Sequence, residues 1–166
     1  MNGVGLRVGQ GFDVHPWSDD PLRRLVLGGV TFDDHRGLQG HSDADPIAHA
    51  CTDALLGAAG VGDIGSFFPD SDPAYADADS VALLAAAVAE LATAGWAPVN
   101  LDCTVICDSP KIAPHREEMR RNLERVVGAP VSVKGKRTEG LVSLSEGIQC
   151  FASALIIAID PAGTTP

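Results

Sequence analysis

The sequence predicts an α+β fold in which a mixed β-sheet is covered by helices, an α/β sandwich. Two observations carry this prediction: β-like runs that alternate or are rich in branched residues, and intervening runs whose apolar residues recur at helical spacing. The 166 residues suit one compact domain, and no internal repeat or low-complexity linker interrupts them. We therefore expect one domain over residues 1–160 and a short C-terminal tail at 161–166.

The N-terminal part is expected to form a strand, a short hairpin and a helix. Residues 6–14 alternate between side-chain types and predict a strand. Two short apolar runs, 25–27 and 30–32, flank a Gly-Gly pair and predict a hairpin or bend. Ser42 precedes an acid and a proline, so we expect its hydroxyl to cap a helix that ends near Gly60.

The rest of the chain continues the same alternation of element types. Residues 61–79 are rich in Gly, Pro and Asp and predict a long loop, and Ser80 is expected to cap a helix that ends at Gly95. The run 148–159 fits a strand or a helix, and its branched residues favour a strand. The elements expected between these are a strand over 96–107, a proline-bracketed loop, a helix over 114–127, a strand over 131–136 and a loop over 138–147.

The composition excludes several classes of partner. Lys and Arg number 12 against 22 Asp and Glu, so the net charge of −10 opposes general binding to nucleic acid or an anionic membrane. Only 5% of the residues are aromatic, which argues against a base-stacking platform. Any phosphate group must therefore be held locally, by a metal, by helix N-termini or by a few placed cations.

The cysteines indicate a reducing compartment. Cys51, Cys103, Cys107 and Cys150 form no C-x-x-C pair and lie in apolar segments, as is typical of reduced, buried thiols in a cytoplasmic protein. No basic region followed by an apolar stretch begins the sequence, so we expect no signal peptide. The longest apolar run, 155–159, is too short to span a bilayer.

Asp13 and His15 are the first candidates for chemistry. Residues i and i+2 of a strand face the same side, so a carboxylate and an imidazole are expected to project together. His49, in the first turns of the predicted helix, would complete a zinc site with an open fourth position. The alternative is a chance Asp-x-His and an ordinary core histidine. Asp53, on the same helical stripe as His49, is expected to be its hydrogen-bond partner.

Three motifs connect these residues to a known family. They are G-F-D-V-H at 11–15, the run that begins G-H-S-D-A-D-P-I-A-H and ends G-S-F-F-P-D-S-D-P at 40–73, and S-P-K at 109–111. With these motifs the sequence resembles the 2-C-methyl-D-erythritol 2,4-cyclodiphosphate synthase family over nearly its whole length. The resemblance implies a homotrimer of α/β sandwiches with active sites between subunits.

The resemblance also implies a reaction in non-mevalonate isoprenoid biosynthesis, catalysed by a phosphorus–oxygen lyase. The substrate would be 4-diphosphocytidyl-2-C-methyl-D-erythritol 2-phosphate, and the products would be the cyclic diphosphate and CMP. A divalent metal, usually zinc, would be joined by Mg²⁺ or Mn²⁺ on the diphosphate. No nucleic acid or membrane partner is implied.

Each family role falls on residues of this chain, as the resemblance implies. The metal ligands would be Asp13, His15 and His49, with Val14 between the first two also at the substrate. The phosphate region would hold His41 and Ser42, with His41 catalytic; the sugar-contacting turn would be Asp63, Ile64 and Gly65, and the adjoining flexible loop Phe68, Pro69, Asp70, Ser71 and Asp72. The cytosine pocket would comprise Cys107, Asp108, Ser109, Pro110, Lys111, Ile112 and Ala113. Substrate contacts would continue through Lys136, Arg137 and Thr138, and Glu139 would contact the second metal.

One region departs from the family pattern. Many members carry T-T-T-E and then a Gly-rich stretch with an arginine, whereas this chain has K-R-T-E at 136–139 and then L-V-S-L-S-E-G at 141–147. Arg137 stands where the family has a threonine that stabilises the transition state, so we expect it to be catalytic by supplying the missing positive charge. The alternative is a solvated pair, Lys136 and Arg137, at an impaired site. Two other functions then come into play: a zinc-containing relative that binds a nucleotide or isoprenoid diphosphate without turnover, and a zinc phosphohydrolase.

Overall fold

A computed structural model describes residues 5–159, and the expected tail at 161–166 lies outside them. Its main sheet has the strand order β1-β6-β4-β5. Only the β4–β5 pair is parallel, so the sheet is mixed, as predicted. The strands are β1 (Leu6–Pro16), β4 (Trp96–Ile106), β5 (Val131–Lys136) and β6 (Gly147–Ala158).

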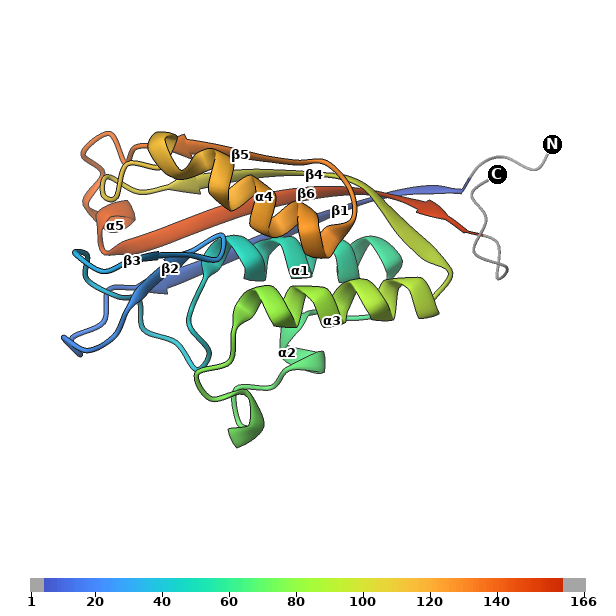
Figure 1. The fold of residues 1–166 in the computed structure, drawn as a ribbon, viewed down its shortest axis with the longest axis horizontal. Coiled ribbons are helices and arrows are strands. Elements are labelled where there is room, and N and C mark those ends of the chain that lie inside the picture. Colours follow the sequence, from blue (N-terminus) through green and yellow to red (C-terminus); the bar gives the residue numbers. More distant parts are fainter. Residues whose placement is uncertain (1–4, 160–166) are drawn as a thin grey trace.

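The long helices lie together on one face of this sheet (Figure 1). They are α1 (Pro46–Ala59), α3 (Ser80–Thr93) and α4 (Arg116–Val127). Helix α1 packs against β1 and β6 and also against α3, which explains why nearly all of its residues are buried. On the opposite face of the sheet, Val8, Phe12 and Phe151 remain exposed.

Two glycines let β1 approach α1 closely. A Cβ at Gly11 would lie 1.9 Å from the carbonyl oxygen of Ala50, and one at Gly9 would lie 2.0 Å from that of Ala54. Any side chain at these positions would therefore overlap the helix backbone. The G-x-G spacing places both glycines on the strand face that meets α1, and Asp13 and His15 continue that same face.

The short elements occupy the segments between the long ones. The predicted hairpin is confirmed as β2 (Leu25–Leu27) and β3 (Val30–Phe32). The expected loop 61–79 contains α2 (Ile64–Phe67) and a 3₁₀ turn, Pro73–Tyr75, and the expected loop 138–147 contains α5 (Val142–Ser145). A 3₁₀ turn at Ala113–His115 precedes α4, so the predicted helix start at residue 114 was two residues early.

Both predicted serine caps were wrong. The N-cap of α1 is Asp45, whose carboxylate accepts hydrogen bonds from the backbone N–H groups of Ile47 and Ala48. The N-cap of α3 is Asp79, which accepts from Val81 and Ala82. In each case an aspartate directly before the helix supplies the acceptor, because Ser42 lies three residues ahead of Asp45 and Ser80 is already the first residue of α3. Ser42 and Ser80 are buried instead and form contacts within the site described below.

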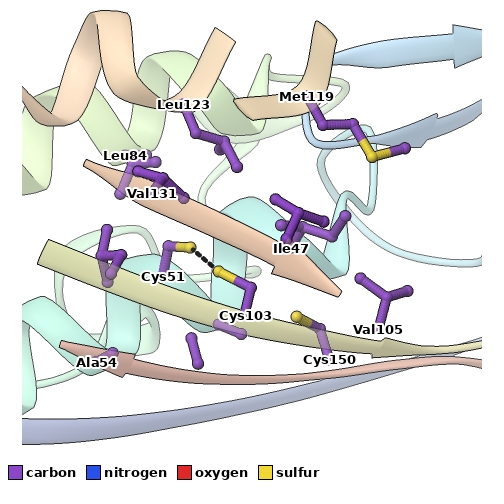
Figure 2. Close-up of a cluster of buried hydrophobic side chains, with 14 of the residues drawn as sticks. Ile47, Cys51, Ala54, Leu84, Cys103, Val105, Met119, Leu123, Val131 and Cys150 are labelled. Carbon is purple, nitrogen blue, oxygen red and sulfur yellow. Dashed lines mark hydrogen bonds between the residues drawn. The ribbon is translucent and has the colours of Figure 1, made fainter. Parts of the chain in front are cut away.

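The core lies between the helices and the sheet, and thiols form part of it (Figure 2). The four cysteines are free and buried, as the sequence predicted. The Sγ atoms of Cys51 in α1 and Cys103 in β4 lie 3.2 Å apart. Among residues 5–159, no helix is both long and apolar enough to cross a membrane.

Candidate active site

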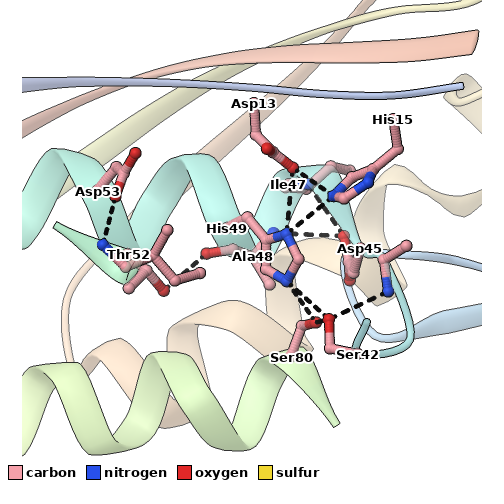
Figure 3. Close-up of polar contacts among 12 residues, drawn as sticks. Asp13, His15, Ser42, Asp45, Ile47, Ala48, His49, Thr52, Asp53 and Ser80 are labelled. Carbon is pink, nitrogen blue, oxygen red and sulfur yellow. Dashed lines mark hydrogen bonds and ion pairs between the residues drawn. The ribbon is translucent and has the colours of Figure 1, made fainter. Parts of the chain in front are cut away.

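Asp13, His15 and His49 converge at the end of β1, as the sequence predicted. The Oδ2 atom of Asp13 lies 2.9 Å from His15 Nε2 and 3.1 Å from His49 Nδ1. The two histidine nitrogens are themselves 3.1 Å apart. Figure 3 shows the three side chains meeting between β1 and the first turn of α1.

Contacts outside the triad orient both histidines. The His15 Nδ1 atom lies 2.8 Å from the carbonyl oxygen of Gln39, which can only accept, so Nδ1 carries a proton. The His49 Nε2 atom lies 2.8 Å from the hydroxyl of Ser80 and 3.1 Å from that of Ser42. The remaining nitrogen of each ring faces Asp13.

The electrostatics favour a cation at this point. Burial opposes the ionisation of Asp13, but its contacts with the two histidines outweigh burial and hold its pKa well below the usual range. Burial also tends to lower the pKa of His15, but the hydrogen bond and the negative charge of Asp13, together with the hydrogen bond to Gln39, outweigh burial and raise that pKa. A cation bound at this point would meet the carboxylate of Asp13 and the two ring nitrogens that face it. One carboxylate and two imidazoles are ligands that suit zinc.

A cavity of about 420 Å³ opens beside the triad. The predicted site residues that line it with the triad are His41, Ser42, Ile64, Gly65, Phe68, Pro69 and Asp70. Gly40, Tyr75 and Leu83 also line it and were missed from sequence. Tyr75 is the one tyrosine of the chain and lies in the predicted loop 61–79, close to the residues that the resemblance assigned to the substrate, which was a usable signal. For Leu83 and Gly40, no signal in the sequence indicated a place in the site.

Four other predicted residues take different positions. Val14 faces the exposed side of the sheet, away from Asp13 and His15. Asp63 and Asp72 use their carboxylates to cap α2 and the Pro73–Tyr75 turn. The backbone oxygen of Asp72 nevertheless touches the site, because it lies 2.9 Å from His41 Nε2. Ser71 does not line the cavity.

Asp53 does not contact His49, so its predicted role was wrong. Its Oδ1 atom accepts a hydrogen bond of 2.8 Å from the backbone N–H of Ile64. Asp53 lies one turn further along α1, where it fixes the start of α2 instead. Its contribution to the cavity is therefore the placement of Ile64 and Gly65.

The predicted cytosine loop lines a second cavity, of about 300 Å³. The predicted residues that line it are Cys107, Asp108, Pro110, Lys111, Ile112, Ala113, Lys136 and Arg137. Arg116 and Gly135 also line it and were missed. Arg116 opens α4 three residues after the end of the loop, so its place in the sequence was a signal. Within the described residues, no residue lines both cavities.

Thr138 joins the cytosine loop to the end of β5. Its backbone N–H and its hydroxyl both donate to the carboxylate of Asp108, over 3.2 and 2.5 Å. These hydrogen bonds lower the pKa of Asp108. Thr138 is itself buried, whereas Arg137 and Glu139 on either side are exposed. Ser109 and Glu139 do not line the cavity.

Known proteins share both the sequence and the fold. The chain matches the YgbB family model over residues 6–157. The 2-C-methyl-D-erythritol 2,4-cyclodiphosphate synthase of Bordetella petrii is 54% identical over 158 residues, which cover 92% of this chain and 96% of that protein.

Solved structures agree with this. The IspF–CDP complex of Plasmodium falciparum is 34% identical, with a TM-score of 0.78 over 94% of this chain and 98% of that one. The bifunctional IspDF of Campylobacter jejuni is also 34% identical, with a TM-score of 0.88 over 96% of this chain, which spans only 44% of that longer protein. With the family model matched over almost all of the described residues, this chain belongs to the YgbB family.

Proposed function

We propose that this protein converts 4-diphosphocytidyl-2-C-methyl-D-erythritol 2-phosphate to 2-C-methyl-D-erythritol 2,4-cyclodiphosphate and CMP, as a phosphorus–oxygen lyase of non-mevalonate isoprenoid biosynthesis in the cytoplasm. The observation that carries the proposal is the convergence of Asp13, His15 and His49 beside a cavity, in a chain 54% identical to a named synthase.

The proposed reaction needs positioning more than it needs a strong base. The attacking 2-phosphate is already anionic and belongs to the same molecule as the phosphorus it attacks. Catalysis then depends on bending the substrate, neutralising charge and aligning the attacking and leaving oxygens. The cavity beside the triad has His41, Ser42 and the α2 turn on its walls, which suits a folded phosphorylated chain.

Zinc is the proposed resident metal. Asp13, His15 and His49 would hold it, and when bound it would supply Lewis-acid polarisation of a phosphate oxygen. We assign His41 and Ser42 to the phosphate groups. His41 donates from Nε2 to the carbonyl of Asp72, which leaves its Nδ1 as the other ring atom available to substrate. Glu139, exposed at the end of β5, is proposed to contact Mg²⁺ or Mn²⁺ on the diphosphate.

We infer that the cytidine end binds at the second cavity and that the active form is a homotrimer with active sites between subunits. The IspF–CDP complex supports a cytidine nucleotide as ligand. Two observations support shared sites: the two cavities of one subunit have no lining residue in common, and the face of the sheet opposite the helices exposes Val8, Phe12 and Phe151.

The test of this function is product formation by zinc-loaded protein. We expect incubation with the substrate to release CMP and the cyclic diphosphate, detected by ³¹P NMR and mass spectrometry. Release of inorganic phosphate would indicate a phosphohydrolase, and absence of CMP would indicate a relative without turnover. Either outcome would overturn the proposal.

The metal assignment has its own test. Wild-type protein is expected to bind about one zinc per subunit, measured by elemental analysis after reconstitution. An Asp13→Ala, His49→Ala double variant should lose that zinc, because two of the three ligands are gone. His35→Ala is the control, since His35 packs on Phe32 away from the triad and its loss should leave zinc content unchanged. Full zinc retention in the double variant would contradict the assignment of these ligands.

A further inference from the structure

We propose that Ser80 and Asp43 are positioning residues of the metal site, which keep the proton of His49 on Nε2 and leave Nδ1 open toward Asp13 and His15. The proposal rests on the proposed zinc binding and deepens it. Neither residue lines the cavity beside the triad. Both act through His49 and not through the substrate.

Ser80 is fully buried, and Figure 3 shows its hydroxyl beside His49 and Ser42. Its hydroxyl oxygen lies 2.8 Å from His49 Nε2 and 3.2 Å from the hydroxyl of Ser42, and it also bonds to the Oδ1 atom of Asp43. The backbone N–H of Ser80 donates to the other oxygen of Asp43, over 3.2 Å. Ser80 therefore touches three polar side chains with one oxygen atom.

The proton of the Ser80 hydroxyl must point to Asp43. Both carboxylate oxygens of Asp43 face backbone donors, because the N–H of Asp45 also lies 3.2 Å from Oδ1. Asp43 is therefore an acceptor at both oxygens. A hydroxyl has a single proton to donate, so the Ser80 oxygen is left to accept from its other neighbours.

The consequence for His49 follows directly. The Ser42 hydroxyl also lies 3.1 Å from Nε2, but the shorter contact, 2.8 Å, is with the Ser80 oxygen, which has no proton left to donate. That contact favours donation by Nε2, so the neutral ring carries its proton on Nε2 and a free electron pair on Nδ1. Nδ1 is the atom that meets Asp13 Oδ2 and His15 Nε2. A His49 with its proton on Nδ1 would instead donate to Asp13 and could not bind a metal there. Hydrogen bonds of this kind are how proteins orient metal-binding histidines.

The same contacts bring separate segments to the metal. Ser80 is the first residue of α3, directly after the segment 61–79 that supplies cavity walls, and Asp43 directly follows His41 and Ser42. The backbone N–H of Asp43 donates to the carbonyl of Ala78, over 3.0 Å. The proposed hydrogen-bond chain Asp43–Ser80–His49 thus connects one metal ligand to the start of α3 and to the segment 41–43, which contains the proposed phosphate-binding residues.

The test compares zinc affinity and the His49 tautomer in folded variants. Chelator competition on Ser80→Ala should show zinc affinity lowered by ~10–100-fold, the range for losing such an outer hydrogen bond. Ser80→Thr keeps the hydroxyl and should restore most of the affinity. Thr52→Ala is the matched control, because it removes a buried hydroxyl from α1 that donates to Ala48 and does not contact the triad.

A ¹⁵N NMR measurement on the histidine rings keeps the test independent of folding in the variants. Wild-type protein without zinc should show His49 protonated at Nε2, and Ser80→Ala should show a fraction protonated at Nδ1. Wild-type His49 protonated at Nδ1, or a Ser80→Ala variant with unchanged zinc affinity, would overturn this inference and leave the proposed function standing. Wild-type protein that fails to bind zinc would overturn the proposed function itself.

Discussion

Lys136 and Arg137 lie at the end of β5, where both line the cavity of the cytosine loop. Side chains alternate along a strand, which would have turned only one of them toward this cavity. The strand ends at Lys136, so the alternation does not extend to Arg137. In a chain of net charge −10, two adjacent cations beside the proposed nucleotide cavity would help to hold phosphate.

Arg137→Ala tests which of the two cations matters. A guanidinium grips a phosphate with two parallel hydrogen bonds, so we expect a loss of ~1.5–3 kcal/mol in substrate affinity or transition-state stabilisation. The measurement is kcat and KM for CMP release. Lys136→Ala is the matched control and should cost much less. If both variants turn over like wild type, the pair is only a solvated part of the surface.

Single residues were predictable where their chemistry limits what they can do. The sequence predicted the metal-binding candidates Asp13, His15 and His49 from their chemistry and their positions. Asp13 and His15 are two residues apart on a strand, His49 is near a helix start, and carboxylate and imidazole groups are ligands that suit a metal. Ser42 and Ser80 were assigned the wrong role because a serine near a helix start resembles a cap. The caps are Asp45, three residues after Ser42, and Asp79, directly before Ser80. The two hydroxyls are free for His49 only because those aspartates do the capping.

At the scale of elements, the contact between β1 and α1 sets the geometry of the triad. β1 carries Asp13 and His15, and α1 carries His49, so the separation of the two elements fixes the separation of the ligand atoms. That separation is small because Gly9 and Gly11 present no side chain to the helix. The metal site therefore depends on residues that never touch it.

Gly11→Ala should weaken both the fold and the metal site. The added Cβ would lie 1.9 Å from Ala50 O, so the strand must move away, at a cost toward the upper end of about 1–3 kcal/mol for overpacking. Denaturant unfolding measures the stability, and chelator competition measures the accompanying loss of zinc affinity.

Gly57→Ala is the control for that substitution. Gly57 lies on the exposed side of α1, and a Cβ there meets nothing within 4 Å. Alanine is a better helix former than glycine, so this variant should be stabilised by about 0.5–1 kcal/mol and bind zinc normally. A Gly11→Ala protein as stable as wild type would contradict the close packing of β1 on α1.

The elements themselves were largely predictable, and the loops were not. In each long strand and helix the apolar residues recur with the period of that element, and burial follows the same period. The place of these elements could therefore be read from the sequence. The short helices α2 and α5 have four residues each and too few turns to give such a pattern. α2 forms because Asp63 and Ser66 cap it reciprocally and Asp53 binds its first N–H, and the last of these contacts joins positions eleven residues apart.

At the scale of the whole molecule, the single chain has two properties that bear on the proposed assembly. It presents an apolar face on the side of the sheet away from the helices, and it holds the metal triad and the cytosine loop in different cavities. Neither property could be read from the sequence, because both depend on which strand faces are left uncovered once the helices have packed. Phe12 and Phe151 pack against each other across neighbouring strands on that face, with ring centroids 4.7 Å apart and ring planes tilted by 40°.

Phe12→Glu tests whether this face joins subunits. Phe12 is 47% exposed in the single chain, so a charge there is tolerated by a monomer but would be buried unpaired in an assembly through this face. Light scattering at micromolar concentration should give wild type three times the chain mass of 17.2 kDa, and Phe12→Glu a smaller species with native circular dichroism. Leu22→Glu, an equally drastic change at a residue 87% exposed away from the sheet, should remain trimeric.

The Phe12→Glu variant should also release CMP slowly while it retains zinc. Separated subunits keep the Asp13, His15 and His49 triad but lose the neighbour that brings the cytosine loop to it. A wild-type monomer, or a Phe12→Glu trimer, would contradict assembly through this face.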